Sequence, residues 1–314
     1  MNILLTAIGK RVQLISFLKK NFNIIGVDCS SINPAKHFVD VFFEVPSYQN
    51  ESYVDALLKI CKDTKIDGLI PLFEKEYSLL DRRRKEFHDL GVQVLLSNSF
   101  VLNICENKVR TYEFFLEQSI QTPKTWSKSE DVNICDDKSF FIIKPRDGMG
   151  SQGVYRAKNK EELNFFSKYV PNSMIQEFIQ GTEYTIDVFC DHGGRVVSCV
   201  PRERLQVRAG EVSKSITRNH PRIIEEAVQI CEKLGGVGPL TLQCIEDSKG
   251  EIYWIEINPR FGGGVPLSIE AGIDYGKMIK EWAEGKLVES QMGKFKPNLL
   301  MLRYDDAIFL ENYK

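Results

Sequence analysis

Two polar side chains interrupt the apolar alternation of the segment EIYWIEINPRF near the middle of the last third of the chain. Glu256 and Asn258 are two residues apart, so on a β-strand both would project from one face, while Ile255 and Ile257 would occupy the other face. Arg260 follows directly. A carboxylate and an amide on one strand face, with a cation next to them, are typical of a site that handles a metal ion and a phosphoryl group.

A third oxygen donor lies on the preceding strand of the same predicted hairpin. With a turn at Ser248 and Lys249, Gln243 would lie nearly opposite Trp254, and Glu256 would be its diagonal neighbour, with side-chain roots about 7–8 Å apart. One carboxylate and two amides suit Mg²⁺, which completes its shell with waters and phosphate oxygens. The alternative is a strand that presents its polar side to solvent.

A glycine-rich stretch, FFIIKPRDGMGSQGVYRAK, precedes this hairpin by about a hundred residues. Its glycines join two predicted strands, whereas those of a dinucleotide-binding loop or a P-loop join a strand to a helix. A hairpin with a glycine-rich tip can lay backbone N–H groups over phosphates. The residues suited to that use are Gly148, Gly150, Ser151 and Gly153. A flexible hairpin tip is the alternative.

Two cations adjoin the glycine stretch. Lys144 and Arg146 are two apart on a predicted strand and would share one face. Because Lys144 follows four apolar residues, we expect it to be partly buried and to need an anionic partner. A further basic run, PRERLQVRAGEVSKSITR, carries more cations than local ion pairing would satisfy. The alternative is that these cations lie on a solvated face. They are Arg202, Arg204, Arg208, Lys214 and Arg218.

The composition sets limits on partners and location. The formal net charge is −2, which gives no overall field to attract nucleic acid or an anionic membrane. Eight cysteines lack any C-x-x-C pair, and no basic-then-apolar leader precedes the first strand, so we expect reduced thiols in the cytoplasm. No apolar run approaches the roughly 18 residues that a membrane-spanning helix requires.

The elements that position these residues fall into two patterns. Strands at 3–6, in NIIGVDCS, KIDGLIPLF and VQVLLS, alternate with helices that include 51–63 and 75–90, which predicts a parallel α/β domain over residues 1–103. Mixed antiparallel strands and helices follow, with helices near 105–118, 160–168 and 221–234. The first turn, TAIGKR, has one glycine where a dinucleotide fingerprint has three, so an NAD-dependent enzyme is a weaker alternative, although Asp28 ends the second strand.

These motifs, in this order, resemble the ATP-grasp enzymes, particularly single-module relatives of the carbamoyl phosphate synthetase large chain. The resemblance covers nearly the whole chain: the α/β domain, Lys108 in ENK, IIKPRDGMGSQGV, IQEFIQGTEYTID, LQCIEDSKGEIYWIEINPRFGGG and PLSIEAGIDYGKMIKEWAEGKL. It implies a pre-ATP-grasp α/β domain at 1–103, and then a two-lobed ATP-grasp domain with mixed and antiparallel sheets. The small lobe with the glycine loop would span 104–180, and the large lobe with the metal site and the C-terminal tail 181–314.

The resemblance also implies roles for individual residues. Lys108 and Lys144, with Arg146 and the glycine loop, would contact nucleotide phosphates. Gln176, Glu177 and Ile179 would meet adenine, and Glu183 the ribose. Gln243, Glu256 and Asn258 would be magnesium ligands. Arg260 would lie beside the transferred phosphoryl group, with Lys214 and Arg202 as further catalytic cations.

The implied activity is an ATP-dependent ligase that joins a carboxylate to an amine through an acyl phosphate and releases ADP. The implied cofactors are ATP and two Mg²⁺ ions, with Mn²⁺ able to substitute. Small-molecule substrates are expected, with no nucleic acid or membrane partner, and a homodimer is common among such relatives. Carboxyphosphate or carbamoyl phosphate chemistry on bicarbonate or carbamate is one alternative, and a non-catalytic nucleotide-binding module is another.

Overall fold

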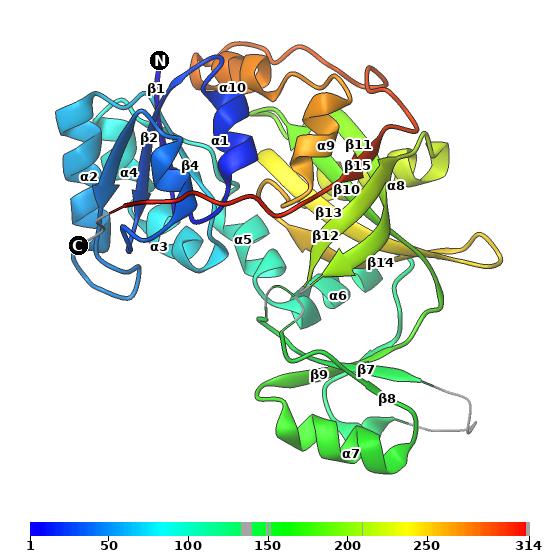
Figure 1. The fold of residues 1–314 in the computed structure, drawn as a ribbon. Coiled ribbons are helices and arrows are strands. Elements are labelled where there is room, and N and C mark those ends of the chain that lie inside the picture. The colour runs from blue at the N-terminus through cyan, green and yellow to red at the C-terminus, as the bar shows by residue number, and fades with distance from the viewer. Residues whose placement is uncertain (133–139, 149, 151, 209, 312–314) are drawn as a thin grey trace.

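The structure is a computed structural model that describes residues 1–132, 140–148, 150, 152–208 and 210–311. Figure 1 shows an N-terminal α/β domain in blue and cyan, a large lobe of long antiparallel strands, and a small lobe that extends away from both. The predicted class, a parallel α/β domain followed by a two-lobed domain with antiparallel sheets, is confirmed.

The N-terminal domain contains a five-stranded sheet in the order β3-β2-β1-β4-β5. Its strands are all parallel: β1 (Asn2–Thr6), β2 (Asn23–Asp28), β3 (Val41–Glu44), β4 (Gly68–Pro71) and β5 (Gln93–Val94). The sequence reasoning missed β3, because it has only four residues and follows β2 with just a short 3-10 turn, η1 (Pro34–His37), between them. Two connecting helices, α1 (Val12–Leu18) and α2 (Tyr53–Thr64), lie where they were expected.

The expected helix at 75–90 is interrupted. A 3-10 turn, η2 (Glu74–Glu76), leads into α3 (Tyr77–Arg82) and α4 (Arg84–Asp89), which are separated at Arg83. The expected helix near 105–118 is α6 (Lys108–Glu117). A second helix, α5 (Ser99–Cys105), precedes it and was not expected. Buried side chains of α5 and α6 belong to the hydrophobic core of the large lobe. The proposed domain boundary at 103/104 falls inside α5.

The small lobe is a four-stranded sheet, in the order β6-β9-β7-β8, covered by one helix. Its elements are β6 (Thr125–Trp126), η3 (Ser129–Asp131), β7 (Phe141–Pro145), β8 (Tyr155–Ala157), α7 (Lys160–Tyr169) and β9 (Ser173–Glu177). The strands β7 and β8 are antiparallel, with Phe141 opposite Ala157, so the glycine stretch is the tip of a hairpin, as predicted. The lobe has a separate core that includes Phe141, Ile143 and Leu163.

The large lobe is a six-stranded sheet in the order β14-β13-β10-β11-β12-β15, with every pairing antiparallel. Its strands are β10 (Gly181–Cys190), β11 (Val196–Arg208), β12 (Glu211–Thr217), β13 (Gly238–Asp247), β14 (Ile252–Asn258) and β15 (Leu300–Leu302). Three helices accompany them: α8 (Pro221–Leu234), α9 (Val265–Glu270) and α10 (Tyr275–Ala283).

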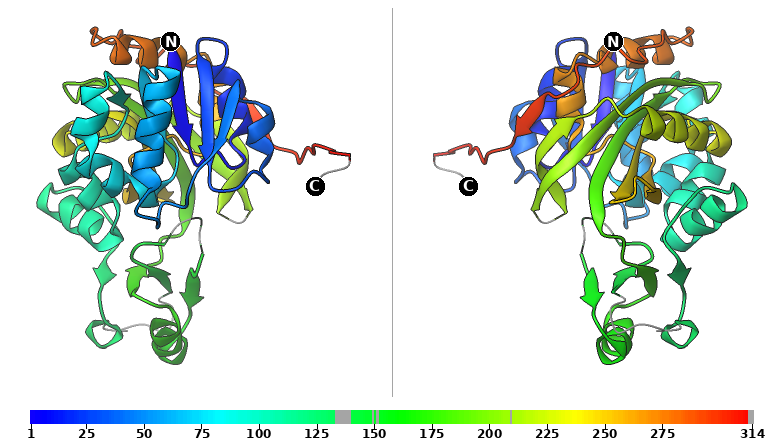
Figure 2. Two further views of the ribbon diagram at one scale, coloured as in Figure 1. Left: turned by 90° about the vertical axis from the view of Figure 1, so that its left-hand side faces the viewer. Right: turned by 90° about the vertical axis from the view of Figure 1, so that its right-hand side faces the viewer.

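One continuous apolar core joins the N-terminal domain to the large lobe. It combines Leu5 of β1 and Ile15 of α1 with Phe189 of β10, Phe261, and Met278 of α10. The small lobe shares none of these residues, and Figure 2 shows it below the other two parts in both side views. The N-terminal domain and large lobe therefore form one platform, to which the small lobe is attached.

None of the helices in the described part of the chain combines the length and the apolarity needed to cross a membrane.

Candidate active site

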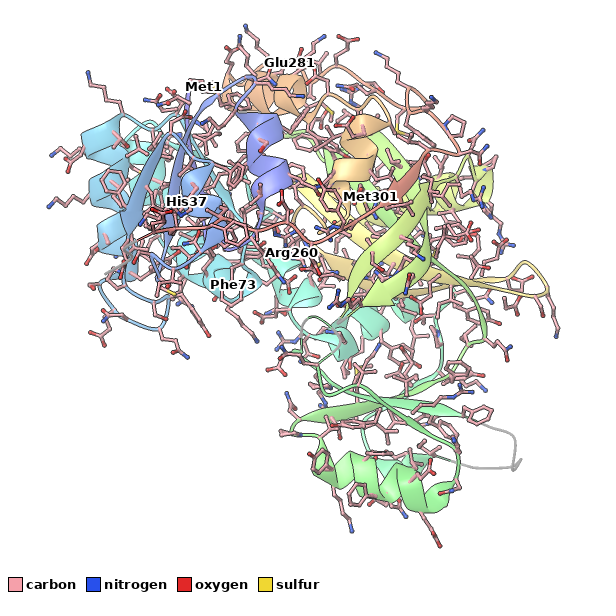
Figure 3. The ribbon with its side chains drawn as sticks, viewed as in Figure 1. Met1, His37, Phe73, Arg260, Glu281 and Met301 are labelled. Carbon is pink, nitrogen blue, oxygen red and sulfur yellow. The ribbon has the colours of Figure 1, made fainter. Side chains whose placement is uncertain are left out.

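A cavity of about 530 Å³ lies where the three parts meet. Figure 3 labels Arg260 at the junction between the N-terminal domain and the large lobe. Most of the predicted site residues line this one cavity: Lys108, Lys144, Gly148, Gly150, Gln176, Glu177, Ile179, Glu183, Arg202, Gln243, Glu256, Asn258 and Arg260. Residues that are far apart in sequence thus contribute to one cavity.

The predicted hairpin register is wrong by one residue near the turn and by two residues at Gln243. Gln243 lies directly opposite Glu256, and Cys244 lies opposite Trp254, so Ile255 is an additional residue of β14 with no partner on β13. Such a β-bulge changes the direction of the side chains that follow it. Gln243 and Glu256 are therefore closer neighbours than the predicted diagonal pair.

The same bulge changes which side chains of β14 face the cavity. Ile255 lines the cavity together with Glu256 and Asn258, although strict alternation had placed it on the opposite face. Ile257 is fully buried in the core, as predicted. The bulge thus supplies an apolar wall beside the carboxylate while the strand remains anchored by Trp254 and Ile257.

Two lysines surround the carboxylate of Glu256. Lys108 begins α6, where the side chain of Asn107 caps the helix by accepting a hydrogen bond from the backbone N–H of Val109. The Nζ atom of Lys108 lies 3.4 Å from Oε1 of Glu256. Burial alone would raise the pKa of Glu256, but the charges of Lys108, Lys144 and Arg260 hold it below its ordinary value. Glu256 is therefore ionised at neutral pH.

Lys144 is the second cation and comes from the small lobe. Its Nζ donates a hydrogen bond of 2.8 Å to Oε1 of Gln176 on the neighbouring strand β9. Burial lowers the pKa of Lys144 to about 8, although the negative charge of Glu256 acts in the opposite direction. The expectation that Lys144 is partly buried and near an anion is met.

The donor chemistry of the cavity fits a magnesium ion. Gln243 and Asn258 line the cavity, and their side-chain amides make no hydrogen bond to other described residues. Thr241, opposite Asn258, uses its hydroxyl to donate to the carbonyl of Arg260. One ionised carboxylate and two amide oxygens on adjacent strands form a hard oxygen-donor set, which Mg²⁺ prefers.

Apolar side chains line another part of the cavity, near the connection between the lobes. Glu177, Phe178 and Ile179 follow Gln176 at the end of β9. The further apolar lining residues are Ile142, Val154, Ile245 and Ile255. Flat apolar walls with backbone polar groups at their edge suit a heterocyclic base. Phe178 was not among the predicted residues.

The glycine loop covers one side of the cavity. Lys108 donates a hydrogen bond of 2.6 Å to the carbonyl of Gly148. Gly210, at the tip of the β11–β12 hairpin, approaches Gly150 so closely that a Cβ on Gly210 would lie 2.4 Å from the Gly150 carbonyl carbon. The two tips therefore meet over the site. The predicted phosphate contact Ser151 lies outside the described residues.

Glu183 and Arg204 form a pair at the cavity wall. The Nε atom of Arg204 lies 3.2 Å from Oε2 of Glu183, and Nη1 of Arg204 donates to the hydroxyl of Thr185. The Glu183 side chain is half exposed, so its second oxygen can accept hydroxyl protons of a ligand. Thr185 also lines the cavity but was missed by the sequence reasoning.

Arg202 is fixed by a buried ion pair. Its Nε and Nη2 donate to the two carboxylate oxygens of Asp187 at 2.7 and 2.9 Å, and Ser268 donates to the same carboxylate at 2.5 Å. The Nη1 atom is buried without a hydrogen-bond partner among the described residues. Arg202 thus lines the cavity as a fixed positive charge.

Local pairing does not satisfy the basic run, as expected, but all four of its arginines find acidic partners. Besides Arg202 and Arg204, Arg208 lies 3.2 Å from Asp305, and Arg218 lies 2.7 Å from Glu203. Asp187, Glu183 and Asp305 lie outside the run, on β10 and in the C-terminal segment, whereas Glu203 belongs to the run itself.

Three predicted residues do not line the cavity: Arg146, Gly153 and Lys214. Because β7 ends at Pro145, its alternation does not extend to Arg146, which instead donates to the carbonyls of Ser173 and Ser127. Lys214 is exposed on β12 opposite Leu302. The expected common face of Lys144 and Arg146 is therefore not found.

The N-terminal domain contributes two charged residues that the sequence reasoning missed. Nε of Arg260 lies 2.5 Å from Oε1 of Glu74 in η2, and Arg11 reaches the same cavity from the β1–α1 loop. That loop is held by Asp28, whose carboxylate accepts the N–H of Gly9 at 2.9 Å. The acid that would mark a dinucleotide site thus orients the loop carrying Arg11.

Sequence profiles agree with this arrangement. The profile of the ATP-grasp domain matches residues 105–264, and that of the PylC-like N-terminal domain matches residues 3–95. A D-alanine–D-alanine ligase of Fusobacterium nucleatum is 24% identical over 253 residues, which is 77% of this chain and 79% of that protein. A carbamoyl phosphate synthase large chain of Clostridium botulinum is 23% identical over 278 residues. This match covers 81% of this chain but only 25% of that protein.

Solved structures show the same fold. A biotin carboxylase of Campylobacter jejuni, in complex with β,γ-ATP, superposes with a TM-score of 0.74 at 16% identity, covering 95% of this chain and 74% of that one.

The two-lobed fold, with a glycine hairpin above a carboxylate and two lysines, defines a nucleotide-binding enzyme of the kind that uses ATP and Mg²⁺. The chain belongs to the ATP-grasp family, and its first domain is of the PylC-like type. The resemblance inferred from the sequence is confirmed.

Proposed function

We propose that this protein is an ATP-dependent carboxylate–amine ligase that forms an amide or peptide bond. A carboxylate oxygen of one substrate attacks the γ-phosphorus of ATP and ADP leaves. The nitrogen of an amine then attacks the acyl carbon of the acyl phosphate and inorganic phosphate leaves. The observation that carries the proposal is the convergence of Lys108, Lys144 and Glu256 with the Gln243 and Asn258 amides in one cavity.

The nucleotide would lie between the two lobes. Its base would occupy the apolar wall at Phe178 and Ile179, and its ribose would meet Glu183. Lys108 and Lys144 would neutralise phosphate charge, since phosphoryl transfer depends mainly on positioning and electrostatic stabilisation. Gln243, Glu256 and Asn258 would hold Mg²⁺, for which we propose two ions with Mn²⁺ as a substitute, and bound metal would neutralise the charge that develops on the phosphate oxygens.

The remaining residues would protect and position the acyl phosphate. Contact between the glycine loop and the β11–β12 hairpin would exclude water, which would otherwise hydrolyse the intermediate. Arg260, held by Glu74, and Arg202, held by Asp187, would face the acyl phosphate from the platform side. For Arg146, Gly153 and Lys214, which lie away from the cavity wall, direct contact would require movement of the small lobe or of the β11–β12 hairpin.

The relatives support a ligase of small molecules, although the carbamoyl phosphate synthase match spans only a quarter of that chain. No described cysteine is in a disulfide, which supports our inference of a reducing, cytoplasmic location. We also propose a homodimer, as in the structure of a related biotin carboxylase domain dimer from Hydrogenobacter thermophilus.

The test is a screen for ADP release with pairs of carboxylates and amines, in the presence of Mg²⁺. For any active pair, the carboxylate is labelled with ¹⁸O. We expect one labelled oxygen in the released phosphate, because the carboxylate oxygen that attacks ATP stays bonded to phosphorus when the amine displaces the phosphate from the acyl carbon. ADP release that depends on bicarbonate alone would instead favour carboxyphosphate chemistry. Nucleotide binding without ADP release for any pair would favour a non-catalytic module.

A further inference from the structure

Arg11 occupies an unusual position among the cations of the cavity. It follows β1 in a loop fixed by the hydrogen bond between Gly9 and Asp28, and it lines the cavity at the end formed by the N-terminal domain. Its Nη1 atom would lie 3.5 Å from a Cβ on Gly263. The guanidinium is therefore held against the glycine run that follows Arg260.

The neighbouring charges are already paired. Arg260 pairs with Glu74, Arg202 with Asp187, and Arg303 with Glu211. Four guanidinium groups thus face three carboxylates, and Arg11 is the one that makes no ion pair or side-chain hydrogen bond with any described residue. Burial lowers the pKa of Arg11, and the charge of Arg260 adds to this effect. The charge of Glu211 offsets this only in part, since Glu211 is paired with Arg303. A desolvated cation that lacks a carboxylate of its own is costly, and an anionic ligand would reduce that cost.

Glu211 lies beside Arg11 across the same glycine. A Cβ on Gly263 would be 3.8 Å from the carboxyl carbon of Glu211, and this contact is as close as the one to Arg11 within a few tenths of an ångström. The carboxylate oxygen nearest to this position is Oε2, at 4.0 Å, and it also accepts a hydrogen bond of 3.2 Å from Arg303, while Oε1 accepts none from described residues. The space above Gly263 is thus bordered by a guanidinium on one side and a carboxylate oxygen on the other.

We infer that this space binds the carboxylate and the amino group of a free α-amino acid, with Arg11 pairing with the carboxylate and Glu211 with the ammonium. This inference rests on the proposed ligase function, for which it names one substrate class. An α-amino acid carries its carboxylate and its ammonium group on one carbon, so a small molecule above Gly263 can present one charge to Arg11 and the other to Glu211. A phosphate group fits less well, because Glu211 would repel its second negative charge.

The experiment measures the melting temperature of the full chain with Mg²⁺ and a non-hydrolysable ATP analogue, across a panel of L- and D-amino acids. Each amino acid is compared with its α-amide, which lacks the carboxylate, and with its N-acetyl derivative, which lacks the ammonium. We expect at least one free amino acid to raise the melting temperature, and both blocked forms to give no rise.

Three variants locate the effect. Arg11→Gln should weaken binding of the active amino acid at least tenfold, while the rise caused by the ATP analogue alone is kept. Gly263→Val fills the space between the two charges and should have the same selective effect, which keeps the test valid even if Arg11→Gln folds poorly. Lys10→Gln changes an exposed cation of the same loop and should bind like the unmodified protein.

The inference is overturned if no amino acid raises the melting temperature, if the blocked forms act as well as the free ones, or if Arg11→Gln and Gly263→Val bind unchanged. The ligase function can fail separately. ADP release that is supported only by substrates other than α-amino acids would support the ligase function and contradict the amino acid site. Amino acid binding without ADP release for any pair would support the site and contradict the ligase function.

Discussion

Arg260 of the large lobe and Glu74 of the N-terminal domain form an ion pair across 186 residues of sequence, with Nε and Oε1 2.5 Å apart. Both side chains are about four-fifths buried. Glu74 therefore fixes the orientation of the cation that we place beside the transferred phosphoryl group.

Replacing Glu74 by glutamine should reduce kcat about tenfold or more, because a misplaced stabilising group loses much of its effect in the transition state. The KM for ATP should change little, since the nucleotide contacts lie on the two lobes. Steady-state kinetics of Glu74→Gln, with exposed Glu51→Gln as the matched control, would check this. An equal rise in the KM for ATP would instead indicate a general loss of structure.

Lys144→Ala and Glu256→Ala should each lower ATP turnover by about 10²-fold or more, since each removes a charge from the centre of the cavity. The fold should persist, because neither side chain belongs to an apolar core. Substrate-dependent ADP release and circular dichroism would be measured together, with Lys158→Ala, an exposed lysine of the small lobe, as the control. Unchanged ADP release in either variant would contradict the assigned roles.

The lowered pKa of Lys144 predicts a pH dependence of nucleotide binding. Below about pH 8 the amine is protonated and attracts phosphate, whereas above this value the free protein loses the charge and must take up a proton to bind. Affinity for ADP should then fall by up to about tenfold per pH unit. In the nucleotide-free protein, this shift makes the free energy of unfolding rise as the pH goes from about 8 towards the ordinary lysine value of 10.5, because the unfolded chain binds more protons.

Titration calorimetry at pH 8.5, in buffers with different ionisation enthalpies, would reveal the proton uptake. Lys144→Arg keeps its charge throughout this range and should show none. The same proton uptake in Lys144→Arg would assign the titration to another group.

The contact between Gly210 and Gly150 predicts that a side chain at position 210 lowers kcat beyond any loss caused by backbone strain. Gly210→Ala places a methyl group against the glycine loop and should lower kcat several-fold by preventing closure. Gly293→Ala is a matched control, because both glycines have φ values in the left-handed region, +78° and +73°, and no atom of the described residues lies within 4 Å of the Cβ position of Gly293. Each substitution should cost about 1–2 kcal/mol of stability through the backbone. Equal kcat values for the two variants would exclude the contact from closure.

The sequence predicted the elements that carry strong patterns. The alternation in EIYWIEINPRF correctly put Glu256 and Asn258 on one face, and α8 begins and ends where its periodicity indicated. The bulge at Ile255 could not be predicted, because it depends on how β13 and β14 twist against each other and leaves no signature in composition.

Other parts of the site were missed because their role arises only from packing between domains. Glu74 lies in a 3-10 turn without a recognisable motif, and Arg11 lies in a loop whose glycines alone were considered. Arg146 was overestimated for the opposite reason, since strand alternation was extended one residue past the end of β7. Sequence periodicity describes single elements, whereas Glu74 is positioned against Arg260, 186 residues away, and Arg11 against Gly263, 252 residues away.

The shared apolar core between the N-terminal domain and the large lobe limits the routes by which substrates enter and products leave the cavity. Opening that seam would expose Phe189, Phe261 and Met278 to water, so substrates cannot arrive by separating these two parts. The small lobe has its own core and can swing without exposing theirs. ATP should therefore enter, and ADP leave, on the side of the glycine hairpin, through movement of the small lobe.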